Sequence, residues 1–299
     1  MTARYIIDGA QLALWRREAI GQANRAGVEP AAIDQLLDEF TGLDELSLRL
    51  ELFKDKAEIQ LYIDFAKLKR LWRQRLDGRM PVQYLTGVTH WRNFSLIVSP
   101  DVLIPRPQTK CLIDLAIASV KSKSEFISGD WADLGTGSGA IALGLAEAFP
   151  SGTIHAVDYS PKALKIAEKN AAKEGLRNRI RFYQGNWFDP LGDLKGQLSG
   201  MVANPPYMPS KTIPELQPEM RLHEPNLAYD GGEDGLNFIR ELVEIAPDYL
   251  CLGGVWLVEM LAGQAPAVRE MLENQGSYEE VQIFSDLAGV ADVVLACKR

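Results

Sequence analysis

Four consecutive residues combine an amide, two prolines and an aromatic ring: Asn204, Pro205, Pro206 and Tyr207. They follow an apolar run, residues 201–203, which is typical of the end of a short buried strand. Proline cannot donate to a sheet and fixes its own φ, so the two prolines end the strand and stiffen the turn. The turn is therefore expected at the carboxyl edge of a sheet, where open α/β sheets bind ligands.

This turn suits the chemistry of a planar NH2 group, in an amide or a nucleobase, whose nitrogen is a poor nucleophile because its lone pair is delocalised. The Asn204 side-chain oxygen and the Pro205 carbonyl can each accept one N–H bond and so aim the nitrogen at an electrophile. Tyr207 can lie against the flat face of the group. We predict catalytic roles for Asn204, Pro205 and Tyr207, and substrate binding by these residues and Pro206. A simple strand-terminating turn is the alternative.

A glycine-rich loop upstream is a candidate site for the electrophile. Residues 131–134 form a predicted strand, and the loop after it opens a predicted helix. Glycine permits a tight turn and lets the backbone approach a ligand closely. The spacing G-x-G-x-G differs from the dinucleotide-binding fingerprint. We assign to this site the loop and the acid before it: Asp133, Gly135, Thr136, Gly137, Ser138 and Gly139.

Polar side chains also follow the next two predicted strands. Strand 153–157 ends at Asp158, whose carboxylate can accept hydrogen bonds from both hydroxyls of a ribose. Strand 180–183 leads to Asn186 and Trp187, which can flank an adenine by hydrogen bonding and stacking. Each carboxylate alone is also explained as a helix cap or turn residue. Their recurrence after successive strands, followed by Asn204 after the fourth, favours a ligand site.

The loop holds no basic residue to meet a phosphate. Adenosine carrying a sulfonium therefore fits this edge better than a pyrophosphate, and we predict S-adenosylmethionine as the cofactor. Its methyl group would be displaced in line by the nitrogen that Asn204 orients. This chemistry needs no metal.

Composition restricts the class of protein. The 299 residues are 46% hydrophobic and 24% charged, which fits a globular protein with an ample core and two domains. No apolar run is long enough for a membrane span, and the N-terminus lacks a signal-peptide pattern. Three scattered cysteines and three histidines give neither metal-ligand spacing nor a disulfide framework. We expect a cytoplasmic monomer without a membrane partner.

Charge is spread unevenly along the chain. Residues 1–110 carry a net charge of +2 and residues 111–299 a net charge of −10. An acidic catalytic half argues against stable binding of nucleic acid, which needs a basic face. The basic residues near the end of the N-terminal part are a solvated helix face or a docking site for an acidic partner or RNA: Lys67, Lys69, Arg70, Arg73, Arg75 and Arg79.

Three regions follow from the patterns. Residues 1–80 are predicted as a helical bundle for substrate recognition, including helices around Leu46–Leu52 and Ile59–Leu68. Residues 81–107 are predicted as a β-hairpin linker. Residues 108–299 alternate strands and helices, and strands at 278–284 and 290–296 close the sheet as an antiparallel pair. The fold class is α/β, a doubly wound seven-stranded sheet with a small N-terminal bundle. Residues 208–227 are predicted as an ordered loop over the acceptor site.

Several motifs occur in the order seen in one family: Pro81-Val-Gln-Tyr-Leu-Thr-Gly, Val102-Leu-Ile-Pro-Arg-Pro, Asp133-Leu-Gly-Thr-Gly-Ser-Gly, Asn204-Pro-Pro-Tyr, His223-Glu-Pro and Asp230-Gly-Gly-Glu-Asp-Gly-Leu. The chain resembles the protein-(glutamine-N5) methyltransferases that modify peptide chain release factors, over nearly its whole length. The resemblance implies a class I methyltransferase domain, S-adenosylmethionine as donor, and methylation of the glutamine in the Gly-Gly-Gln motif of release factors. It also implies that Asn204 belongs to the cofactor site and that the N-terminal bundle helps to recognise this protein substrate.

The chain departs from the family pattern at a few positions. Gln108 and Lys110 stand where the family usually has acidic residues, and Asp292 stands where a basic residue is usual. The glycine expected soon after Glu259 is absent. The first two changes bear on how the methionine end of the donor is held. Glu224 is interpreted as structural, because an amide methylated at nitrogen loses its proton easily without a general base.

Three alternatives remain at this point. A glutamine methyltransferase of a ribosomal protein would keep the chemistry and change the substrate. Adenine-N6 or cytosine-N4 DNA methyltransferases use related turns, but they need a basic DNA face and usually a target-recognition region. A non-catalytic donor-binding translation factor would keep the fold without turnover, and the residues at 108 and 110 are its only support.

Overall fold

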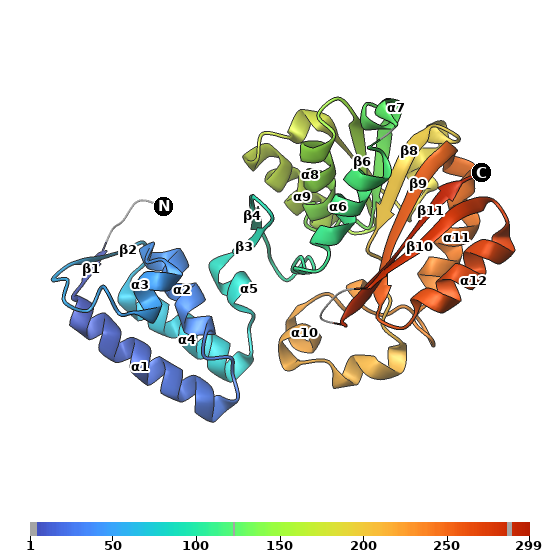
Figure 1. Cartoon of the computed structure of the whole chain (residues 1–299). Coiled ribbons are helices and arrows are strands. Elements are labelled where there is room, and N and C mark those ends of the chain that lie inside the picture. Colours follow the sequence, from blue (N-terminus) through green and yellow to red (C-terminus); the bar gives the residue numbers. More distant parts are fainter. Residues whose placement is uncertain (1–4, 122, 286–288) are drawn as a thin grey trace. The chain divides into compact units, whose positions relative to one another are not determined.

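A computed structural model describes residues 5–121, 123–285 and 289–299, and the chain divides into two units (Figure 1). The N-terminal unit holds the described residues up to Gly87 together with Gln217–His223. The catalytic unit holds Val88–Leu216 and the described residues from Glu224 onward. Residues 217–223, which the sequence assigns to the catalytic region, thus belong to the N-terminal unit.

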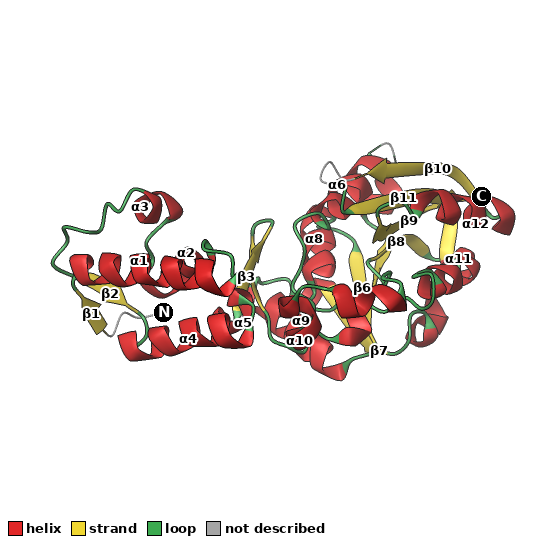
Figure 2. Cartoon of the chain, turned by 90° about the horizontal axis from the view of Figure 1, so that it is seen from below, coloured by secondary structure: helices red, strands yellow, loops and turns green. Residues whose placement is uncertain are grey.

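The N-terminal unit is mostly helical, as predicted. Figure 2 shows α1 (Gly9–Ala26), α2 (Ala32–Thr41) and α4 (Phe65–Gly78) side by side, with the short helices α3 (Glu45–Arg49) and α5 (Val82–Thr86) nearby. Asp8, Asp44 and Asp64 cap α1, α3 and α4 by accepting backbone N–H bonds, which is the usual role of such side chains. The inner helix faces bury one apolar cluster that includes Leu12, Leu36 and Trp72.

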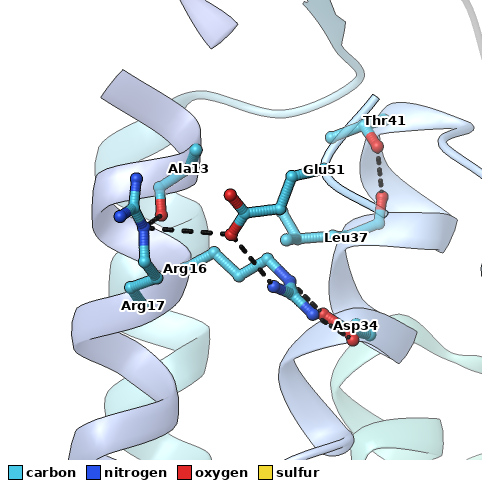
Figure 3. A network of polar contacts seen from close by, with 7 residues as sticks. All are labelled: Ala13, Arg16, Arg17, Asp34, Leu37, Thr41 and Glu51. Atoms are coloured by element: carbon cyan, nitrogen blue, oxygen red, sulfur yellow. Dashed lines mark hydrogen bonds and ion pairs between the residues drawn. The ribbon is translucent and has the colours of Figure 1, made fainter. Parts of the chain in front are cut away.

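Polar contacts also join the helices of this unit (Figure 3). The Arg16 guanidinium, which is almost buried, donates two hydrogen bonds to Asp34 of α2 at 2.6 and 2.7 Å and lies 3.7 Å from Glu51. Helix α10 (Pro218–His223) is held in the same unit, because Arg75 donates to Glu219 at 2.8 Å and His223 Nε2 lies 2.6 Å from the Gly78 carbonyl.

Two predictions for this part of the chain are wrong. Residues 59–61 were expected in a helix, but β2 (Ile59–Leu61) is a strand that pairs antiparallel with β1 (Tyr5–Ile7). Ile59 and Leu61 are buried on either side of exposed Gln60, and this period of two is that of a strand. Residues after Pro81 begin with helix α5, and only then comes the hairpin β3 (Val88–Trp91) and β4 (Phe94–Ile97).

The predicted seven-stranded α/β sheet of the catalytic unit is confirmed, with strand order β10-β11-β9-β8-β5-β6-β7. The parallel strands are β5 (Asp130–Leu134), β6 (Thr153–Asp158), β7 (Ile180–Gln184), β8 (Leu198–Ala203) and β9 (Leu250–Leu261). The closing strands β10 (Tyr278–Ser285) and β11 (Ala291–Lys298) are antiparallel, as expected.

Helices cover both faces of this sheet (Figure 1). One face packs against α6 (Lys110–Ser119), α8 (Ala140–Ala148) and α9 (Pro161–Lys173), and the other against α11 (Asn237–Tyr249) and α12 (Ala265–Gln275). The short helix α7 (Ser124–Ile127) precedes β5. Because the central strands are buried on both faces, most of their residues are apolar, and every residue from 198 to 203 is buried.

Candidate active site

The strand register brings the polar residues to one edge of the sheet. One row of paired residues crosses four adjacent strands: Val157, Leu134, Ala203 and Val258. The chain continues from each of these into the carboxyl edge, where the next residues are Asp158, Gly135, Asn204 and Glu259. Parallel strands thus place side by side three residues predicted from the sequence and one, Glu259, that was not.

A cavity of about 250 Å³ lies at this edge. The predicted residues that line it are Gly135, Gly137, Asp158, Asn186, Trp187, Asn204 and Pro206. Others on its wall were not predicted, among them Asp101, Leu103, Tyr159, Leu227 and Phe238. These unpredicted residues come from loops and a helix far apart in the chain, and their spacing in the sequence does not indicate that they share a site.

The glycine loop is shaped by its neighbours. Gly135 has φ of +81°, and a Cβ there would stand 3.3 Å from the Trp187 ring. Asp158 braces the loop, since one carboxylate oxygen accepts from the Gly137 N–H and the other from the Ser160 N–H, both at 2.8 Å. Burial raises the pKa of Asp158. Each oxygen has a second lone pair, so the carboxylate can also accept from a ligand.

Asp133 lies beneath the loop and is fully buried. Its Oδ2 accepts from the Thr136 hydroxyl at 2.6 Å and from the Ala142 N–H at 2.9 Å. Burial raises the pKa of Asp133 to about 7. Thr136 and Ser138 are buried as well. These predicted residues therefore support the loop from behind, and Gly135 and Gly137 form its surface toward the cavity.

At the end of β8, Asn204 is held by two residues from other parts of the chain. Its Nδ2 donates to Glu259 Oε1 at 3.0 Å and to the Thr109 hydroxyl at 3.2 Å. The Tyr207 hydroxyl donates to the same Glu259 oxygen at 3.3 Å. Burial and the nearby Glu259 charge raise the pKa of Tyr207 well above its usual range. One feature of the sequence could have indicated Glu259 as a site residue, because it is a lone acid directly after the apolar run 255–258.

Two glycines of the Asp230-Gly-Gly-Glu-Asp-Gly-Leu motif pack against the tetrapeptide. A Cβ on Gly235, which has φ of +82°, would lie 2.3 Å from the Tyr207 carbonyl oxygen. A Cβ on Gly231 would lie 2.8 Å from the Pro206 carbonyl oxygen. Only glycine fits where two backbones approach so closely. The motif therefore fixes the path of the turn that carries Asn204.

A buried ion pair holds the segment after the tetrapeptide. Arg106 Nη2 donates to both Glu224 oxygens, at 2.9 and 2.7 Å, and to the Tyr229 hydroxyl at 2.6 Å. Tyr229 in turn donates to Glu224. The Glu224 side chain is only 2% exposed. Glu224 thus has the structural partners that its expected role requires.

The unusual residues lie around this site. Gln108 and Lys110 flank Thr109, which accepts from Asn204. Asp292 is buried, and its Oδ2 accepts from the Gly263 N–H at 2.8 Å, which braces the turn after β9.

Comparison with known proteins places this site in a class. Residues 128–197 match a family model described as a methyltransferase domain. The catalytic domain of hMettl16, solved in complex with an RNA hairpin, is similar in fold, with a TM-score of 0.54 and 15% identity over 80% of this chain and 84% of that one. The fold and the site define a class I methyltransferase.

Curated relatives narrow the class. A release factor glutamine methyltransferase from Synechocystis sp. is 47% identical over 97% of both chains. One from Thermosynechococcus vestitus is 46% identical over 88% of this chain and 89% of its own length. The chain belongs to the release factor glutamine methyltransferase family.

Proposed function

We propose that this chain methylates the side-chain amide nitrogen of the glutamine in the Gly-Gly-Gln motif of peptide chain release factors, with S-adenosylmethionine as donor. The observation that carries the proposal is Asn204, held at the sheet edge with both Nδ2 hydrogens bonded inside the protein and its side chain on the cavity wall. An amide oxygen presented in this way accepts an N–H from a planar NH2 group. Family membership supports glutamine as the bearer of that group.

The residues of the cavity fit the donor. Asp158 retains lone pairs for two ribose hydroxyls, and Trp187 lies across Gly135 with its ring tilted against Phe238. The aromatic wall suits an adenine, and glycine at 135 leaves room for a ligand against the backbone. When bound, the donor supplies a methyl group on a positive sulfur. The protein holds the two reactants in line.

Asn204 and the Pro205 carbonyl would each accept one hydrogen of the glutamine NH2, which fixes the direction of attack. The amide nitrogen forms the new bond to carbon as the carbon–sulfur bond breaks, and the nitrogen then loses one proton to solvent. Neither a covalent enzyme intermediate nor a general base is needed, which agrees with Glu224 being held by Arg106.

The test is transfer to a purified release factor. The factor is incubated with this protein and labelled S-adenosylmethionine, and the product is analysed by intact mass and peptide mapping. We expect one added methyl group on the Gly-Gly-Gln glutamine, and none with Asn204→Ala. Donor binding without any transfer would reject release factors as substrates, and ribosomal proteins and then DNA would be tested next.

The N-terminal unit is the candidate for recognising the body of the substrate. Of the six basic residues singled out from sequence, Arg75 and Arg79 contact Glu219, at 2.8 and 3.0 Å. The other four lie exposed on α4: Lys67, Lys69, Arg70 and Arg73. This face would dock an acidic surface of the release factor.

A partner that acts in translation also implies a cytoplasmic location, and in the described chain no helix is long and apolar enough to cross a membrane.

Charge reversal tests the docking face. Arg70→Glu with Arg73→Glu should raise the KM for the release factor about tenfold, because each reversed charge repels the acidic partner. The matched control is Lys54→Glu with Lys56→Glu, which reverses two exposed charges elsewhere in the same unit. Equal KM values for the two double variants would leave the α4 charges as a solvated helix face.

A further inference from the structure

Glu259 stands beside the catalytic amide without a part in the chemistry described so far. We propose that Glu259 is a positioning residue, which sets the rotation of the Asn204 amide so that Oδ1, and not Nδ2, is presented to the acceptor nitrogen. The inference rests on the proposed transfer to a planar amide and adds a residue that makes this transfer possible.

The location of Glu259 is dictated by the sheet. Ala203 of β8 pairs in register with Val258 of β9, so Asn204, the first residue after β8, lies beside Glu259, which is still within β9. Glu259 has no solvent exposure and follows the fully buried residues 255–258. A carboxyl group in such a place must be held by hydrogen bonds, because burying it without partners is costly. The hydrogen bonds it makes are therefore part of the design of the site.

Those bonds decide which end of the Asn204 amide faces inward. The two ends of an asparagine amide have nearly the same shape, so packing alone does not distinguish them. The hydroxyl of Thr109 can donate or accept and would tolerate either rotation. A carboxylate can only accept, so the end that faces Glu259 must be the NH2 group, as the 3.0 Å bond shows. Glu259 is the contact that excludes the flipped amide.

Tyr207 strengthens this selection. Its hydroxyl donates to the same Glu259 oxygen at 3.3 Å. Burial, with the Glu259 charge, raises the pKa of Tyr207, so the hydroxyl keeps its proton and remains a donor. One carboxylate oxygen thus holds both polar side chains of the tetrapeptide. The flipped amide would set the Asn204 carbonyl against this oxygen and offer the acceptor nitrogen a donor in place of an acceptor.

An exchange of the two groups provides the test. The single variants are Asn204→Asp and Glu259→Gln, and the double variant N204D/E259Q places the carboxylate on the turn and the amide on β9. In the double variant the new amide on β9 can donate to the new carboxylate on the turn, which leaves one carboxylate oxygen for the acceptor nitrogen. The readouts are kcat and KM for methylation of a release factor, S-adenosylmethionine affinity by calorimetry, and the unfolding temperature.

We expect N204D to lower kcat by about 100-fold or more, because two carboxylates then meet at hydrogen-bond distance. E259Q should lower kcat by about tenfold, since its amide permits both rotations of Asn204. The double variant should recover about tenfold in kcat over N204D. S-adenosylmethionine affinity, measured for all three proteins, separates a loss of donor binding from a loss of catalysis. Glu279→Gln, the same change on an exposed position of β10, should leave kcat unchanged.

A double variant that is folded, binds S-adenosylmethionine and is no more active than N204D would overturn the proposal. A purely structural role for Glu259 would appear as a lower unfolding temperature in E259Q with unchanged kcat. If the wild-type protein methylates no release factor, the proposed substrate fails by itself. The unfolding temperatures then decide the pairing: a higher value for N204D/E259Q than for N204D supports it, and an equal or lower value rejects it.

Discussion

The donor end and the acceptor end of the proposed active site are built in different ways. At the donor end, one short stretch supplies the loop, and its support comes from within about 25 residues: Asp133, Thr136 and Asp158. At the acceptor end, Asn204 depends on Thr109, 95 positions earlier, and on Glu259, 55 positions later. The donor end is therefore a local structure, and the acceptor end exists only when distant parts of the chain have assembled.

This difference predicts that changes in support will be tolerated better at the donor end. Backbone packs against backbone around the tetrapeptide, and neither side can yield. At Gly135 of the donor loop the neighbour is a side chain, Trp187, and side chains can adjust. The substitutions below probe this contrast, from the largest expected effect to the smallest.

Removal of Arg106, the arginine that pairs with buried Glu224, should have the largest effect on stability. Arg106→Ala leaves Glu224 buried without its cation, which should lower the free energy of unfolding by about 3 kcal/mol. Chemical denaturation with two probes measures the loss. The matched control is Arg240→Ala, which breaks the exposed pair with Asp234 and should cost about 0.5 kcal/mol. Equal losses would show that the Arg106 pair is no more important than one on the surface.

Gly235→Ala should come next. Its Cβ meets the Tyr207 carbonyl oxygen at 2.3 Å and the backbone adopts a positive φ, so we expect a loss of about 2–3 kcal/mol in unfolding free energy and a fall in kcat. Gly276→Ala is the control, because it has a similar φ of +84° and open space around it. If G235A loses no more unfolding free energy than G276A, close backbone packing at Gly235 does not contribute to stability.

At the donor end, Gly135→Ala should be milder. The added Cβ stands 3.3 Å from the Trp187 side chain, and the strain of positive φ costs about 1 kcal/mol. Because Gly135 lines the cavity, affinity for S-adenosylmethionine should fall about tenfold, measured by calorimetry. Gly175 has φ of +74° and no atom within 4 Å of an added Cβ. Gly175→Ala should therefore show only the backbone strain of positive φ and leave the affinity for S-adenosylmethionine unchanged. If G135A destabilises the protein as much as G235A, the contrast between the two ends fails.

The same contrast explains what could be predicted from sequence. The glycine loop, Asp158 and the tetrapeptide could be predicted at the sheet edge, because each stands next to a strand whose apolar run is recognisable in the sequence. Thr109, Arg106 and Glu259 were not assigned to the site, because their roles depend on the register of strands and on turns far apart in sequence. Asp133 was assigned to the donor site, and that role stays a prediction; the structure shows that Asp133 braces the loop through Thr136 and Ala142.

The errors in the N-terminal unit have a related cause. Ile59–Leu61 alternates like a strand, but three residues carry little signal. Its partner strand, Tyr5–Ile7, stands more than 50 positions earlier in the sequence. Helix α10 is separated from the rest of its unit by more than 120 residues. Helix α10 is joined to the N-terminal unit by individual contacts, such as that of Arg75 with Glu219. Such contacts cannot be predicted from the periodicity of the sequence.

The smallest effect concerns pH and the donor end. Asp133 has a folded-state pKa of about 7 because of burial, above its usual value of 3.8. Between these values the folded state binds more protons than the unfolded state, so the contribution of Asp133 to stability is full below about pH 4 and is lost as pH rises toward 7. Asp133→Asn removes this titration. The stability of wild type relative to D133N should therefore fall by about 1 kcal/mol between about pH 6 and pH 7.

His155 makes the comparison with D133N necessary. Burial lowers its pKa, so the unfolded state binds its proton more readily and stability falls as pH drops below about 6.5. The two groups thus oppose each other in the wild-type profile, and only the difference between the two proteins isolates Asp133. If that difference does not change with pH, Asp133 is ionised in the folded state throughout. The buried carboxylate would then be stabilised fully by Thr136 and the Ala142 N–H, and the donor loop would be supported by a permanent charge.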